Sequence, residues 1–133
     1  MEAGAQVDIL PADVYFKSMA QAILASDETI QKNPQLIQKL VRATVKGMKD
    51  IMADPKAATA VYVAHVPAHK GKDASILKAF EMYNQYVYAK QKVPGEMDEV
   101  RLGELQKFYV DNGVVPKNVP LKDLYTNQFV SGK

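Results

Sequence analysis

The length of 133 residues suits one domain, because a chain of this size buries roughly two thirds of the surface that its unfolded form exposes. Hydrophobic residues make up 47% of the chain and charged residues 24%, which excludes an intrinsically disordered or fibrous protein. The 17 Lys and Arg residues are mixed along the chain with 15 Asp and Glu residues and leave a net charge of +2, so nucleic acid is not an expected partner.

The absence of cysteine removes several kinds of chemistry at once. Disulfides, thiolate zinc sites and a cysteine nucleophile are all excluded, although the cellular compartment stays open. No apolar run approaches the length of a membrane span, and the first residues, Met1 to Gly4, lack the basic and apolar regions of a secretion signal. We therefore expect no export signal or membrane segment within the chain as written.

The first quarter of the chain predicts two short strands. Residues 6–10 alternate apolar and polar side chains and end at Pro11, which is typical of a strand. Residues 20–25 read Ala-Gln-Ala-Ile-Leu-Ala, a short, mostly apolar run that fits a buried strand or a helical turn equally well by periodicity.

Helical signals begin at Ser26, which with Asp27 is a good N-cap residue type. Pro34 is placed as a first-turn proline and opens a long helix, and Asp54 with Pro55 opens a shorter helix that Pro67 ends. The long helix has an apolar face that we expect in the core, formed by Leu36, Ile37, Leu40, Val41, Val45, Met48, Ile51 and Met52. Its polar residues are expected in solvent: Gln38, Lys39, Arg42, Lys46 and Lys49.

The second half of the chain predicts a loop and three more helices. Residues 65–72 lack periodicity and are expected to form the loop. Asp73 is expected to cap a third helix with Tyr83 in its core face, and Asp98 to cap a fourth helix that stops at Asn112 and Gly113. Residues 121–129 are expected to form a last short helix.

The chain offers no recognisable catalytic centre. His65 and His69 have the spacing of two ligands on one helix face, but Pro67 separates them and no cysteine or nearby carboxylate completes a metal site. Serine-nucleophile motifs and glycine-rich phosphate loops are also missing from the sequence. We therefore predict a protein that is not an enzyme and has no metal or cofactor.

Two groups of short motifs resemble one known family. Asn33-Pro34-Gln35-Leu36 leads to Val41-Arg42-Ala43 and Lys46-Gly47, and Asp54-Pro55 follows one helix later. The end of the chain has Asp111-Asn112-Gly113, then residues 121–127 and Phe129. In order and spacing these motifs are similar to the later part of solute-binding proteins of the nitrate, sulfonate and thiamine-pyrimidine type.

The resemblance implies an α-dominated α/β chain with a partial periplasmic-binding-protein-like fold, in which about two short N-terminal strands precede about five helices. Residues 1–133 are then one domain, the C-terminal part of a solute-binding protein, with residues 1–27 as the hinge and strand region and residues 28–133 as the helical region. The parent family is periplasmic or extracytoplasmic and delivers its ligand to an ABC permease. Because such proteins have two lobes, this chain alone cannot form the complete cleft.

The resemblance also implies a ligand and its contacts. We expect a small molecule, an anion or a pyrimidine-like compound, held without catalysis by Asp13 and Tyr15 in the loop after the first strand. The alternative is that Asp13 caps a local turn and Tyr15 packs. A second hypothesis is a truncated, self-associating homo-oligomer without a ligand, because helices and strands built for a larger fold leave uncovered faces. A third is a relative of the thiamine-pyrimidine synthase, although neither His65 nor His69 matches its sacrificed histidine.

Overall fold

The regular structure of this chain is helical in every part that can be described. The computed structural model describes residues 6, 8, 10, 14, 15, 19 and 21–130. Within them, the longer elements are five α-helices: α1 (Asp27–Lys32), α2 (Pro34–Ala53), α3 (Pro55–His65), α4 (Asp73–Tyr86) and α5 (Glu99–Asp111). Short 3-10 turns form η2 (Pro67–His69), η3 (Tyr88–Lys90) and η4 (Leu121–Asp123).

The prediction of two N-terminal strands was wrong. None of the described residues forms a strand: Gln6, Asp8 and Leu10 have no regular structure, and neither do residues 21–25. A strand satisfies its main-chain N–H and C=O groups only through a neighbouring strand, so an alternating pattern is not enough where no sheet is available. The described fold is therefore α rather than α/β.

The helix starts follow the predicted capping residues at three of four positions. Ser26, Asp54 and Asp98 each accept hydrogen bonds from main-chain N–H groups in the first turns of α1, α3 and α5, at 2.9 to 3.1 Å. Asp73 was expected to cap α4 but is its first residue, after Lys72, which makes no side-chain cap. There its negative charge still favours the helix N-terminus.

The segments between and after the helices differ from the sequence expectation. His65 ends α3 and residues 67–69 form a 3-10 turn, where a plain loop was expected. The last helix, predicted over residues 121–129, shrinks to the single turn η4. Tyr83 was expected in the core, yet it is exposed and stacks on Tyr88 with ring centroids 5.7 Å apart.

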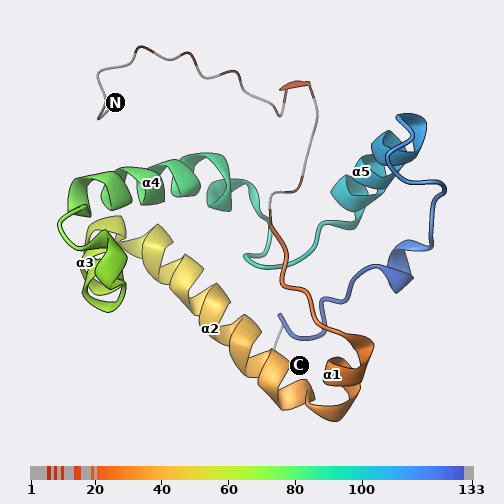
Figure 1. Ribbon diagram of the computed structural model, residues 1–133, viewed down its shortest axis with the longest axis horizontal. Coiled ribbons are helices and arrows are strands. Elements are labelled where there is room, and N and C mark those ends of the chain that lie inside the picture. Colours follow the sequence, from red (N-terminus) through yellow and green to blue (C-terminus); the bar gives the residue numbers. More distant parts are fainter. Residues whose placement is uncertain are drawn as a thin grey trace.

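Helices α2, α3 and α4 pack against one another at one end of the molecule (Figure 1). Tyr62 of α3 lies between His69 and Phe80 of α4, with ring centroids 5.5 and 5.6 Å away. Asn84 of α4 donates a hydrogen bond to the main-chain oxygen of Ile51 near the end of α2, at 2.9 Å. These contacts fix α4 on the α2–α3 pair.

Helix α5 lies apart from that group and packs on the segment that follows it (Figure 1). The Gln106 side chain makes two hydrogen bonds with the main chain of Val119, of 3.0 and 2.7 Å. A methyl group at Gly103 would lie 3.5 Å from Leu121, so these elements are in van der Waals contact. The segment after η4 then returns to α2.

The core of the described part is small. Ile37, Val41 and Thr59 are its only buried residues. Large apolar side chains remain in solvent, among them Leu24, Leu36 and Val100 at 90, 59 and 71% exposure. Scattered exposed leucines are ordinary, but so many beside so few buried ones indicate helix faces without a partner. Within the same residues, no helix is both long and apolar enough to cross a bilayer.

Candidate functional site

The structure does not assemble the ligand site that the resemblance implied. Asp13 lies outside the described residues. Tyr15 is described, in a turn, with 80% of its surface exposed. The role of both residues in ligand contact remains a prediction.

Both histidines make local hydrogen bonds. His65 donates through Nδ1 to the main-chain oxygen of Val61 at 2.8 Å, which holds its ring against α3. His69 Nδ1 lies 2.9 Å from the hydroxyl of Tyr62, in the aromatic cluster between α3 and α4. Across the described part of the chain, no group of three or more His, Cys, Asp or Glu side chains could hold a metal ion.

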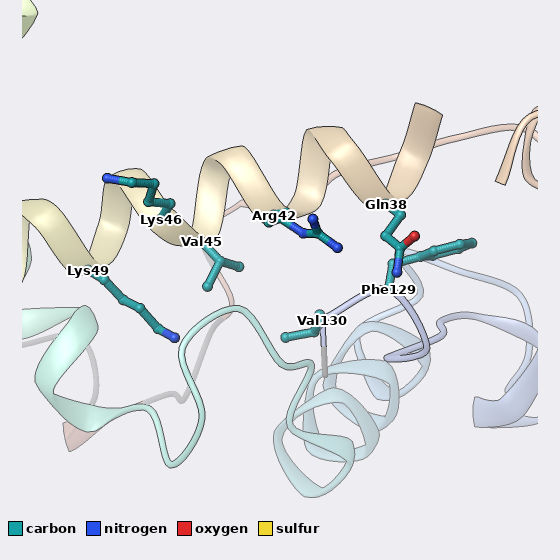
Figure 2. A pocket seen from close by; sticks show the side chains of 7 residues that line it. All are labelled: Gln38, Arg42, Val45, Lys46, Lys49, Phe129 and Val130. Atoms are coloured by element: carbon teal, nitrogen blue, oxygen red, sulfur yellow. The ribbon is translucent and has the colours of Figure 1, made fainter. Parts of the chain in front are cut away.

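A pocket of about 300 Å³ lies between α2 and the last described residues of the chain. Helix α2 provides Gln38, Arg42, Val45, Lys46 and Lys49, and the opposite wall consists of Phe129 and Val130 (Figure 2). The described lining therefore combines cationic residues, an amide and an apolar wall, and none of these residues is acidic.

The helical repeat explains why these α2 residues share a face. Positions 38, 42, 45 and 49 are separated by four, three and four residues, which places them in one row along a helix of 3.6 residues per turn. Figure 2 shows Arg42 extending over the space above Val130, whereas Lys49 extends at the end of the pocket far from Phe129 and the amine of Lys46 points away from the pocket. Lys46 instead pairs with Asp50 at 2.6 Å, one turn further along the helix.

The opposite wall is held in place by Asn127. Its side-chain oxygen accepts a hydrogen bond from the main-chain N–H of Met97 at 2.8 Å, and its side-chain nitrogen donates to the oxygen of the same residue at 3.1 Å. One amide thus pairs with both main-chain groups of a residue 30 positions earlier. This clamp positions Phe129 and Val130, two and three residues further on.

Gly95 lets the turn before α5 approach α2. Its φ angle is +90°, and a methyl group there would lie 2.6 Å from a methyl carbon of Val45 and 3.6 Å from one of Val130. Only glycine fits so close an approach with this backbone conformation. Gly95 therefore lies against Val45 and Val130, two of the apolar residues that line the pocket.

The electrostatic character of the pocket is positive. Within residues 21–130, the ion pairs seen do not include Arg42 or Lys49, so no carboxylate of these residues neutralises either cation. Gln38 adds an amide that can donate hydrogen bonds. This arrangement favours an anionic group beside an apolar one.

Two tyrosines outside the pocket have altered acidity. Burial raises the pKa of Tyr88 above its ordinary value of 10.0, and the neighbouring Tyr83 raises that pKa further. The pKa of Tyr125 is raised as well, first by loss of hydration and then by the charge and hydrogen bond of Glu99. Neither group titrates near neutral pH, so neither has the acidity of a general acid or base.

Sequence reasoning missed this pocket. Arg42 and Lys49 were expected to be only solvated, and Phe129 to pack within a helix. A signal was present, because Arg42, Lys46 and Lys49 recur at helical spacing with no acid before Asp50. The facing wall could not be found in the same way, since it comes from the far end of the chain.

Comparison with known proteins supports the resemblance of the motifs. A family model described as NMT1/THI5 like matches residues 2–58. Over 133 residues, the chain is 28% identical to the riboflavin-binding protein RibY of Chloroflexus aurantiacus, an alignment that covers 97% of this chain. The predicted resemblance to solute-binding proteins of the nitrate, sulfonate and thiamine-precursor type is confirmed. The chain spans 38% of the length of RibY. No solved structure was found to match the chain.

The motifs of this solute-binding type have clear positions in the structure. Asn33-Pro34 and Asp54-Pro55 start α2 and α3, and Val41 is one of the few buried residues. Arg42, from the first group of motifs, and Phe129, from the closing group, line the same pocket. The two groups of motifs, far apart in sequence, therefore meet in space.

Proposed function

We propose that this chain is the C-terminal part of an extracytoplasmic solute-binding protein, which captures a small molecule without catalysis and delivers it to an ABC importer. The observation that carries this proposal is the alignment with RibY, which runs over nearly the whole chain but over little more than a third of that relative. The matching family model favours the same class of protein. Residues 1–27 then belong to the hinge region and residues 28–133 to the helical C-terminal region of one domain.

The exposed helix faces support a place within a larger lobe. Leu36 and Leu40 form one row along α2, about 100° around the helix from the buried Ile37 and Val41, and are 59 and 50% exposed. A stable monomer rarely leaves such a side chain row uncovered on its longest helix. In the proposed parent, the remainder of the same lobe covers this row.

The proposed ligand is a flavin or a related pyrimidine-like molecule. RibY is named as a riboflavin-binding protein, and the ring system of riboflavin contains a pyrimidine ring. We propose that Asp13 and Tyr15 contact the ligand, as a hydrogen-bond acceptor and an aromatic wall. No step of this function requires a nucleophile, a metal or a general acid.

The first experiment reads the gene on both sides of the codons for Met1 and Lys133 and expresses the whole product. We expect an open frame that encodes the other lobe, and quenching of riboflavin fluorescence with a Kd in the micromolar range or below. Replacement of Asp13 and Tyr15 by alanine in that product should weaken binding about tenfold or more. Stop codons on both sides, together with no riboflavin binding, would overturn the proposal.

A second candidate is a self-associating protein without a ligand. The exposed row on α2 favours it, because a second copy of the chain can cover the same apolar surface. Flanking stop codons and a stable dimer in solution support this candidate. An intact longer frame excludes it.

A further inference from the structure

The pocket between α2 and the C-terminal segment has the composition of a ligand site. Among the described residues, it is lined by members of segments 38–49 and 129–130, and Tyr15 is not one of them. An inference about it therefore stands apart from the proposed function, since it does not depend on the other lobe.

The charges select an anion. Arg42 extends over the pocket and Lys49 lies at its edge, far from Phe129 (Figure 2). Neither makes an ion pair in the described part of the chain, and none of the described lining residues is acidic. A guanidinium binds a carboxylate through two parallel hydrogen bonds, which a planar carboxylate matches better than a spherical ion does. Gln38, one turn before Arg42, can donate another hydrogen bond to the same group.

The apolar wall selects a ring. Phe129 lies beside Gln38, and Val45 and Val130 are the apolar residues nearest Arg42 (Figure 2). An aromatic ring gains from stacking on a phenylalanine and from the removal of apolar surface from water. The volume of about 300 Å³ is at the small end of ligand pockets, so it suits one or two fused rings with an acidic group.

We propose that this pocket binds a small aromatic carboxylate, with the carboxylate on Arg42 and the ring against Phe129. Lys49 raises the local positive potential without a fixed hydrogen bond. The Asn127 clamp and the close approach at Gly95 fix the position of Phe129 and Val130 before the ligand binds, so binding loses little conformational entropy.

The test titrates 2-naphthoate into the full chain and follows the backbone amide shifts of α2 and residues 127–130 by NMR. We expect saturable shifts in these two segments with a Kd of about 1 mM or below. Arg42→Gln should weaken binding about tenfold or more, because it removes a charge-assisted contact. Lys39→Gln is the matched control, since it removes the same charge from an exposed position of α2 outside the pocket.

A neutral isostere completes the experiment on the unaltered chain. We expect 2-naphthamide to bind at least tenfold more weakly than 2-naphthoate, because it lacks the charge that Arg42 binds. Equal affinities for the acid and the amide would overturn the proposal. So would equal losses in Arg42→Gln and Lys39→Gln, or shifts confined to other parts of the chain. Riboflavin binding in the longer product has its own readout, so the two proposals fail separately.

Discussion

The side chain of Asn127 ties the C-terminal segment to the turn before α5 through two hydrogen bonds to the main chain. Its amide satisfies the N–H and the C=O of Met97 together, in a part-buried position. A main-chain group deprived of its partner there must find water or remain unpaired, and an unpaired buried group is costly. The sequence indicated Asn127 only as a member of the closing motif; its bonding partner could not be predicted, because it lies 30 residues away.

We expect Asn127→Ala to lower the free energy of unfolding by about 1 to 3 kcal/mol, because two main-chain groups lose their partner. Urea unfolding followed by circular dichroism measures the change. Asn118→Ala is the control, since Asn118 is exposed in the loop before η4. Identical midpoints for the two variants would show that the clamp adds no stability.

Tyr88 predicts an alkaline limit to stability. Burial raises its pKa in the folded chain above 10.0, so the unfolded chain ionises first as the pH rises. The stabilising effect of the neutral phenol is thus complete below about pH 10 and is lost as the pH rises through the folded pKa. In Tyr88→Phe, the part of the decrease in stability at alkaline pH that comes from Tyr88 should disappear. Urea unfolding midpoints measured from pH 8 to 11 show this change. An exposed tyrosine of α4 gives the control, Tyr86→Phe, which should leave the slope unchanged.

At the scale of elements, local sequence signals were sufficient to predict helices but not to predict structure that depends on a partner distant in sequence. Caps and first-turn prolines predicted the starts of α2, α3 and α5, because those bonds form within one turn. The prediction of strands was wrong because a strand needs a partner strand that can be distant in sequence, which a local pattern does not reveal. The prediction of the last helix was wrong for another reason. Thr126 accepts a hydrogen bond from the Gln128 N–H at 3.2 Å, and Asn127 is hydrogen-bonded to Met97. These side-chain hydrogen bonds compete with the main-chain hydrogen bonds of a helix.

The capping bonds of Asp98 should set the stability of α5. One side-chain oxygen accepts from both Val100 and Arg101, so Asp98→Ala should cost about 1 kcal/mol. Asp98→Asn keeps an acceptor in the same place and should recover most of that loss. The difference is measured by thermal unfolding. If asparagine is no better than alanine, the cap is not the source of the stability.

For the whole molecule, uncovered apolar surface is the dominant property. Ile37 and Val41 alone form the buried apolar core of the described part, so α2 presents its other apolar row to solvent. Periodicity correctly identified the apolar residues of this helix but placed Leu36 and Leu40 in the core. A sequence pattern shows which apolar side chains favour burial, but it does not show whether another part of the same chain buries them.

The isolated chain should therefore associate through α2. We expect the double variant Leu36→Lys with Leu40→Lys to lower the weight-average mass in sedimentation velocity toward that of a monomer, because it removes the apolar row. The control adds the same two charges at exposed polar positions, as Gln31→Lys with Gln35→Lys. Equal effects of the two pairs would assign the change to charge repulsion instead.

The clamp between Asn127 and Met97 also has a consequence for the order of folding. Contacts among α2, α3 and α4 join neighbours in sequence, whereas the wall of the pocket must travel from the end of the chain to the first long helix. Closing so long a loop costs entropy before any contact repays it, and such contacts form slowly. During synthesis, the contacts among α2, α3 and α4 can thus form on the emerging chain before residues 129–130 are available to close the pocket.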